Sequence, residues 1–289
     1  MDYKKKMSSA AAAVVFAAAA FTGVTLPAKS IQSPLTPAAQ VQEHPAESKG
    51  TVRPSAASGR AVFRSIDDTA TAQLETVTNM EMTAPGENEN LHALYTGQVL
   101  NGLPHGQGRL VYDNGTVYEG SWANGMEEGQ GTMNYASGNT YTGSYHQALR
   151  NGQGTYVYAT GEVYTGNWTN DKYNGQGTLS YTNGDVYTGS WSNGARVNGT
   201  MTYANGNVYT GGWQNKKRSG QGTMWYANGE QYTGGFSLGC RNGQGEYYYK
   251  NGDYYTGGWR SDKRHGNGTL YCADGTVKTG WWVDDHFIK

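Results

Sequence analysis

A repeat of 23 residues organises this chain from Tyr95 onward. Its most regular member is a tyrosine, which recurs at Tyr95, Tyr118, Tyr141, Tyr164, Tyr187, Tyr209, Tyr232 and Tyr255, with Lys278 at the ninth place. Only the spacing before Tyr209 is one residue short. A glycine follows each tyrosine by two positions and a large apolar residue, usually tryptophan, follows it by four. Self-similarity at such a fixed period is typical of an array of small stacked units.

The motif Tyr-Thr-Gly-x-Trp alternates large and small residues, as a β-strand does when one side is packed and the other is wet. The aromatic residues that define the packed side are Tyr118, Trp122, Tyr164, Trp168, Tyr187, Trp191, Tyr209, Trp213, Tyr255 and Trp259. A second strand follows each Gly-x-Gly step. We expect a ring from the adjacent strand to fill the gap that the glycine leaves between Tyr and Trp.

Asn-Gly pairs such as Asn114-Gly115 and Asn183-Gly184 end these second strands. Asn-Gly between two alternating runs is a strong hairpin signal, because a type I′ turn needs positive φ at both central residues. Each unit is therefore predicted to be a strand, a tight turn, a strand and then a longer loop.

Together these features predict an all-β fold, an elongated single-layer antiparallel array of about eight and a half β-hairpin units over residues 91–289. The composition agrees, because 43 glycines and 23 tyrosines among only 36 % hydrophobic residues suit a thin sheet with an aromatic layer in place of a thick aliphatic core. A single hairpin is marginally stable, so stability must come from stacking each unit on the next.

Tyr-x-Gly-x-Trp followed by Gly-x-Gly at this period resembles the MORN (membrane occupation and recognition nexus) repeat, from Tyr95 to about Trp282. The resemblance implies a single-layer antiparallel β array that serves in protein–protein contact, membrane association or self-assembly. The chain departs from the pattern in unit five, which keeps only Gly199 of its Gly-x-Gly. It also departs at Val99, in place of the first unit's aromatic residue, and at Cys272, in place of the last second-strand tyrosine.

The N-terminal residues 1–28 are predicted to be a signal peptide or a membrane anchor. Lys4, Lys5 and Lys6 precede an uncharged stretch from Met7 to Ala28, which ends with a small residue where a signal peptidase can cut. An uncleaved anchor is the alternative, because the apolar run approaches the ~20 residues that span a bilayer. Both interpretations predict an exported protein that is periplasmic, extracellular or anchored with its repeats facing outward.

Residues 29–90 are predicted to be a low-complexity, largely disordered linker. They are rich in Pro, Ser, Thr, Ala and Gln and poor in aromatic residues, so they bury too little apolar surface to offset their conformational entropy. The alternative to disorder near the end of this linker is a short helix. Asp67 and Asp68 would cap it, and Leu74, Val77 and Met80 would lie near one face.

Nothing in the chain has the pattern of a catalytic, cofactor or metal site. No two of the six histidines lie at metal-ligand spacing, and acidic residues recur singly beside turns. The Gly-x-Gly steps lack the helix and lysine of a phosphate-binding loop. Cys240 and Cys272 occupy different places in the repeat, which disfavours a disulfide. We therefore expect no enzyme activity and no cofactor, and the net charge of −1 argues against nucleic acid as a partner.

Charge differs between the two predicted edges of the array. The longer loops carry a basic edge, whose candidate residues for binding an anionic partner are Lys172, Arg196, Lys216, Lys217, Arg218, Arg241, Lys263 and Arg264. The Asn-Gly turns carry an acidic edge made of Asp113, Glu162, Asp185, Glu230, Asp253 and Asp274. The basic edge is expected to dock an anionic surface such as lipid headgroups. The alternative is that these charges only keep the sheet soluble and its edges unpaired.

The function expected from the sequence is therefore non-catalytic, that of an exported binding or scaffold protein. Its partner is predicted to be a protein or an anionic membrane surface, and the exposed terminal strand at 279–282 is a route to self-association. The alternative is a module that binds cell-wall polysaccharide or other glycans through its aromatic face. The exposure of the aromatic rings decides between these interpretations, since glycan binding needs several flat rings that are accessible to solvent.

Overall fold

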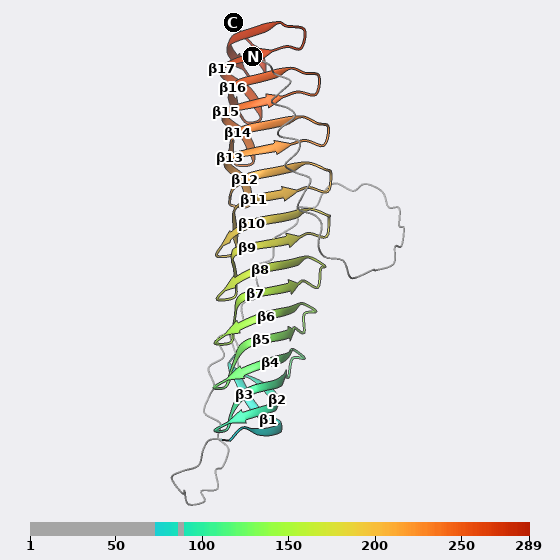
Figure 1. Cartoon of the computed structure of the whole chain (residues 1–289), viewed down its shortest axis with the longest axis vertical. Helices are drawn as coiled ribbons and strands as arrows, with labels where there is room; N and C mark the ends of the chain where they lie inside the picture. The colour runs from blue at the N-terminus through green and yellow to red at the C-terminus, as the bar shows by residue number, and fades with distance from the viewer. Residues whose placement is uncertain (1–72, 86–89) are drawn as a thin grey trace, which may run out of the picture. The chain divides into compact units, whose positions relative to one another are not determined.

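The computed structural model describes residues 73–85 and 90–289, which form one antiparallel sheet in which each strand pairs with the next along the chain (Figure 1). The strands are β1 (Glu75–Pro85), β2 (Asn90–Leu100), β3 (Leu103–Tyr112), β4 (Val117–Ala123), β5 (Met126–Asn134), β6 (Thr140–His146), β7 (Leu149–Val157), β8 (Val163–Thr169), β9 (Lys172–Ser180), β10 (Val186–Ser192), β11 (Ala195–Thr202), β12 (Val208–Gln214), β13 (Lys217–Trp225), β14 (Gln231–Ser237), β15 (Cys240–Tyr248), β16 (Tyr254–Arg260), β17 (Lys263–Tyr271), β18 (Val277–Val283) and β19 (His286–Phe287). The predicted all-β hairpin array is confirmed. The proposed signal or anchor segment lies outside the described residues.

The predicted alternation of a packed and a wet side is also confirmed. In β8, Tyr164 and Trp168 are buried while Thr165 between them is exposed. Tyrosine at this place in the repeat is 0 % exposed in all eight units. The sheet therefore carries its core as one continuous layer of side chains on one face.

The glycines between the aromatic residues make room for a ring, although not for the ring that we expected. Gly166 and Gly177 face each other across β8 and β9, and a side chain on either one would overlap the phenol of Tyr164. The Tyr164 hydroxyl donates a hydrogen bond to the carbonyl of Asn167, at 2.9 Å. The gap is thus filled by the unit's own tyrosine, which leans over the glycine pair. The prediction of a ring from the adjacent strand was wrong.

The two kinds of turn are the reverse of the prediction. At Asn114-Gly115 only the glycine has positive φ, at 87°, and the Gly115 N–H donates to the carbonyl of Tyr112, as in a type I turn followed by a left-handed glycine. The two-residue type I′ turns lie at the opposite edge. An example is Asn170-Asp171, with φ of 47° and 64°. Asn-Gly occupies three of these turns, at Asn101-Gly102, Asn124-Gly125 and Asn193-Gly194, but aspartate, lysine or alanine at the second place hid the type I′ signal in others.

The first hairpin lies ahead of the repeats, within the segment predicted to be linker. β1 pairs with β2 along its length, so the helix proposed around Leu74, Val77 and Met80 is wrong. Val77 and Met80 are both partly buried, although they lie three residues apart, because a β-bulge with Asn79 at φ 55° separates them. The bulge imitates helical spacing. Among the described residues there is no helix of the length and apolarity that a membrane crossing requires.

Unit five lacks a structural element that the other units share. In the others, the first glycine of Gly-x-Gly has positive φ, for example 87° at Gly175, and the strand bulges there. β11 has Val197 at this place, one residue is missing, and its pairing with β12 ends at Asn198. Trp213 also has no acceptor for its indole N–H in the described residues, whereas Trp191 donates to the Gly177 carbonyl at 3.2 Å. The junction between β11 and β12 is therefore weaker than the equivalent junctions between the other repeat units.

Hydrogen exchange will test this weakness. We expect the amides of β11 and β12 to exchange faster than their equivalents in β9 and β10, because local opening follows lost packing and lost hydrogen bonds. Inserting a glycine between Val197 and Asn198 rebuilds the pattern of Arg264-His265-Gly266-Asn267. The insertion should slow exchange at this junction to the level of its neighbours. Equal exchange before and after the insertion would contradict the interpretation.

A second prediction concerns Leu238, which opens a type I′ turn with φ of 52° and is 74 % exposed. The left-handed conformation costs most L-residues about 1–2 kcal/mol and costs asparagine less. Leu238→Asn should therefore raise the free energy of unfolding by roughly 1 kcal/mol. Asn124→Leu, at the same place in an earlier turn, should lower it by a similar amount. Urea unfolding measures the free energy of unfolding of both variants. No change in either variant would show that the left-handed conformation does not strain Leu238.

Candidate binding surfaces

The aromatic side chains of the packed face form an unbroken chain of edge-to-face contacts. Tyr118 contacts Trp122 of its own unit and Tyr145 of the next, both at 5.2 Å between ring centroids and nearly perpendicular. The pattern continues to Tyr255 and Trp282, at 5.4 Å. All ten repeat-defining aromatic residues are 9 % exposed or less. They stabilise the array, and no sugar reaches their faces.

Arginines of the predicted basic edge turn inward onto this aromatic layer. Arg241 lies 4.4 Å from the ring centroid of Trp259 in the next unit, and Arg264 lies 4.4 Å from that of Trp282. Arg196 stacks on Trp213 at 4.5 Å, and Arg218 lies 5.4 Å from Phe236. Each arginine thus bridges two successive units. Such cation–π contacts contribute about 0.5–2 kcal/mol apiece.

Aspartates of the type I′ turns fix two of these arginines, and they also fix Arg150 at the equivalent place in an earlier unit. Arg150 is fully buried, and its Nε lies 2.7 Å from Asp171 Oδ1. Arg241 pairs with Asp262 at 3.2 Å, and Arg264 pairs with Asp285 at 3.1 Å. Although burial alone would raise the pKa of Asp262, hydrogen bonds from Arg241 and Cys240 hold it below its usual value. The separation of 21 residues between Arg and Asp was a sequence signal that we did not use.

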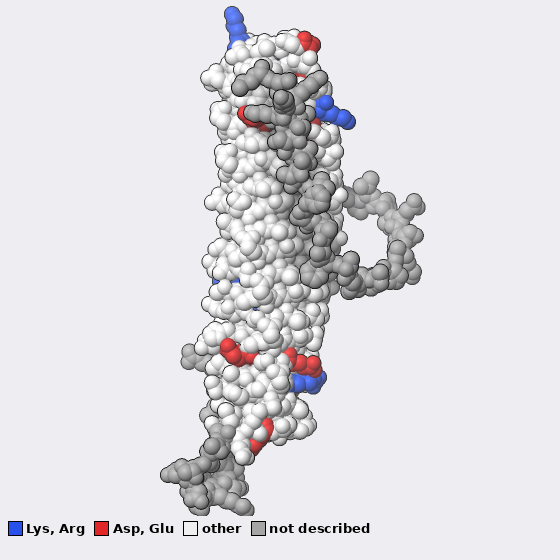
Figure 2. All heavy atoms as spheres, viewed as in Figure 1, with Lys and Arg blue, Asp and Glu red and all other residues white. Residues whose placement is uncertain are grey.

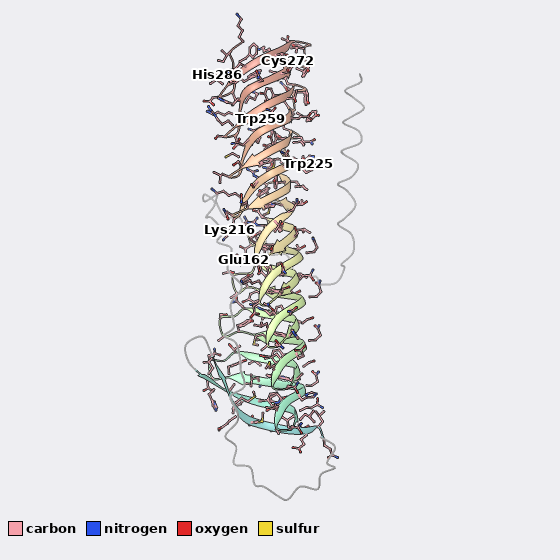
Figure 3. The ribbon with its side chains drawn as sticks, turned by 90° about the vertical axis from the view of Figure 1, so that its left-hand side faces the viewer. Glu162, Lys216, Trp225, Trp259, Cys272 and His286 are labelled. Atoms are coloured by element: carbon pink, nitrogen blue, oxygen red, sulfur yellow. The ribbon has the colours of Figure 1, made fainter. Side chains whose placement is uncertain are left out.

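The lysines of the basic edge remain at the surface. Lys172, Lys216, Lys217 and Lys263 are all exposed, and Lys172, Lys217 and Lys263 each begin the strand that follows a type I′ turn. In Figure 3, Lys216 and Trp225 mark opposite margins of the sheet. The structure therefore divides the eight candidate residues into four inward arginines and four surface lysines.

The predicted acidic edge holds successive units together. Asp185 accepts a hydrogen bond from the N–H of Ala204 at 2.8 Å, and Asp253 accepts one from the N–H of Ala273 at 2.8 Å. Glu230 accepts from the hydroxyl of Tyr247 at 2.7 Å. Glu162, at the same place, is 6 % exposed. Asp113 instead meets the ring of His92 at 3.2 Å, and Asp274 caps Thr276 of its own turn at 2.8 Å.

The electrostatics of the packed layer suit a structural role. Burial raises the pKa of Tyr95, Tyr209 and Tyr255 to about 12, so these phenols stay neutral and keep donating their hydrogen bonds at physiological pH. Within the described ranges no three histidine, cysteine or acidic residues gather as they would around a metal ion. Cys240 and Cys272 are free thiols.

The wet face was not among the binding surfaces predicted from the basic edge and the packed aromatic residues. A row of threonines crosses β5 to β14, each directly opposite the next, from Thr132 and Thr142 to Thr223 and Thr233. Alternate pairs are hydrogen bonded, at 3.1 Å for Thr132 and Thr142. From β5 to β14 the three outward rows nearest the acidic edge include no Lys, Arg, Asp or Glu. Figure 2 shows a face on which charged side chains are scarce along the middle of the ladder. The lack of charge at alternate positions was readable in the sequence.

The family model of the MORN repeat matches eight consecutive segments of this chain, at residues 95–117, 118–140, 141–163, 164–186, 187–208, 209–231, 232–254 and 255–277. No curated protein matches the chain.

Among solved structures, the chain resembles the TCP10 domain of Danio rerio CPAP in complex with a peptide of Danio rerio STIL, with 16 % identity and a TM-score of 0.39 over 62 % of this chain and 81 % of that one. It also resembles the SAS-4 (dCPAP) TCP domain of Drosophila melanogaster in complex with a proline-rich motif of Ana2, with 17 % identity and a TM-score of 0.27 over 61 % of this chain and 84 % of that one.

The ion pairs between units predict a difference between two matched substitutions. Asp171→Asn removes the carboxylate that pairs with the fully buried Arg150, which should cost about 3–5 kcal/mol of stability. Asp262→Asn removes a pair whose aspartate is 47 % exposed, and should cost less than about 1 kcal/mol. Chemical denaturation of the two variants measures the difference. Equal losses would show that burial of the arginine does not set the strength of the pair.

Proposed function

This chain belongs to the MORN repeat family, and we propose that it is a non-catalytic, exported scaffold that binds an anionic membrane surface through one edge of its sheet. The observation that carries the proposal is the division of the basic edge. The arginines pack inside the array, while Lys172, Lys217 and Lys263 recur every second unit on the outside. Three ammonium groups in a line on a stiff support suit a flat anionic surface better than a single compact ligand. A protein partner with an acidic surface is the alternative occupant of the same edge.

Export of the protein supports a membrane surface as the partner, and export is itself part of the proposal. A basic start, an apolar run and a small-residue exit at residues 1–28 are typical of a secretory signal, and its uncleaved form would tether the array to a membrane. Mass spectrometry of the N-terminus of the mature protein distinguishes the outcomes. A mature chain that begins near residue 29 supports cleavage, and an intact N-terminus in the membrane fraction supports the anchor.

Liposome binding of the full chain tests the membrane proposal. We expect it to bind vesicles that contain anionic lipid at low salt and to release them as salt rises, because screening weakens such contacts. The triple variant Lys172→Gln, Lys217→Gln and Lys263→Gln should lose about 3 kcal/mol, or roughly 100-fold in affinity, at about 1 kcal/mol per lysine.

The matched control replaces three exposed residues of the opposite edge, Thr182, Ala204 and Ala227, with glutamine. This control should bind as the wild type does. Wild-type binding that ignores salt, or survival of binding in the lysine variant, would exclude the membrane role and direct the search to protein partners.

A second candidate function is self-association through the C-terminal end of the sheet. Val277, Trp281 and Ile288 are 55 %, 48 % and 59 % exposed there, and apolar residues grouped at a surface mark contact sites. β19 pairs with Trp282 and Val283 of β18, and Ile288 and Lys289 form backbone hydrogen bonds with Trp281, so the open part of the β18 edge runs from Val277 to Gly280. An open strand edge is a template for pairing with another chain.

Sedimentation of the full chain tests this second function. The wild type should show a dimer whose population rises with concentration, and the variant Trp281→Ser with Ile288→Ser should be monomeric. Leu238→Ser removes an exposed leucine elsewhere and serves as the control, which should dimerise as the wild type does. A monomeric wild type at high concentration, or a dimer that survives the double substitution, would reject the C-terminal contact.

A further inference from the structure

One row of the wet face changes its chemistry toward the C-terminal end. The row consists of the outward residues next to the Asn-Gly turns, which lie opposite one another from strand to strand. In the early units it holds mainly valine, threonine and serine, for example Val163 and Val186. From β13 to β18 it runs through Trp225, Gln231, Tyr248, Tyr254, Tyr271 and Val277. We call these six residues the outer aromatic row.

Three tyrosines of the outer aromatic row contact one another, and they are half-buried at Tyr248 and Tyr254 and exposed at Tyr271. Tyr248 and Tyr254 lie 4.7 Å apart between ring centroids, and Tyr254 and Tyr271 lie 5.8 Å apart with planes 26° from parallel. Tyr271 is 46 % exposed, whereas Tyr255, which follows Tyr254 on the opposite face of the sheet, is 0 % exposed. These tyrosines therefore add little to the core of the array, and their function lies at the surface.

Polar groups that form hydrogen bonds accompany the rings. Glu246 and Thr256 lie beside Tyr248 and Tyr254 on the same face, and the Tyr248 hydroxyl donates to Glu246 Oε2 at 3.3 Å. Gln244 and Asn267 occupy the next outward row. In the three outward rows of β13 to β18 that lie nearest the acidic edge, Glu246 alone is charged, and Lys217, Arg260 and Lys263 lie at the other end of these strands. Aromatic rings with a few carboxylate and amide groups and almost no net charge form a surface for a neutral, hydroxyl-rich ligand.

We propose that the outer aromatic row binds a neutral polysaccharide chain. The C–H faces of the sugars pack against the exposed parts of the rings, and their hydroxyls bond to Glu246, Gln244 and Asn267. Because the row crosses the strands, it runs along the array for about 24 Å, at roughly 4.8 Å per strand, which suits an extended chain better than a single sugar. The carboxylate disfavours acidic polymers and anionic lipid headgroups, so this surface is independent of the lysine edge.

Co-sedimentation of the full chain with insoluble cellulose, chitin and a β-1,3-glucan tests the proposal. The wild type should bind at least one of them equally well at low and physiological salt, because the contacts carry almost no net charge. Tyr254→Ser with Tyr271→Ser should weaken binding at least tenfold. Val163→Ser with Val186→Ser changes the same row in earlier units and should bind as the wild type does.

Circular dichroism and the melting temperature show whether each variant keeps the fold, so that a loss of binding is assigned to the surface. A wild type that binds none of the three polysaccharides overturns the proposal, as does an equal loss in the valine variant. Liposome binding is measured on the same variants. It should not change in the tyrosine variant, which separates failure of this proposal from failure of the membrane proposal.

Discussion

The fold depends on a tyrosine ring that leans over a pair of glycines. In each unit the ring covers two strands at the point where neither has a side chain, and its hydroxyl bonds to the carbonyl three residues further on, as Tyr118 does to Ser121 at 2.9 Å. The tryptophan of the next unit then contacts the tyrosine ring in an edge-to-face arrangement, as Trp122 contacts Tyr95 at 5.1 Å between ring centroids. Each such aromatic pair adds about 0.5–1.5 kcal/mol beyond the area that it buries. A sheet one layer thick thereby acquires a core without a second sheet or a helix.

Charged residues reinforce the same contacts between units, which changes how the surface charge is interpreted. A run of arginines at one edge suggests an anion-binding surface, yet their guanidinium groups lie on the rings of the following unit and bond to its turn. The carboxylates at the other edge accept backbone N–H groups of the next turn, as Asp185 does. Binding is therefore left to the features that differ between units: the exposed lysines, the C-terminal end and the outer aromatic row.

The sequence alone predicted the strands, their packed side and the stacking of units, because those follow from a period of 23 and an alternation of two. It did not place the turns correctly, since Asn170-Asp171 adopts the left-handed pair of conformations that Asn-Gly usually marks. The sequence also did not predict β1, because the bulge at Asn79 places Val77 and Met80 on one side of the strand at a spacing that is typical of a helix. The inward direction of the Arg150 side chain could not be predicted, because a side chain this long turns inward only when an aromatic ring and a carboxylate of the next unit contact it.

The free energy of unfolding of Gly177→Ala tests the central claim most directly. A methyl group on Gly177 meets the ring of Tyr164, so the ring must leave the glycine pair and its contact with Trp168 at 5.3 Å must loosen. We predict a loss of about 1–3 kcal/mol, as for other overpacked cores. Thr178→Ala, on the wet face of the same strand, should cost less than about 1 kcal/mol. Equal, small losses in both variants would contradict the claim that the tyrosine–glycine contact holds the array together.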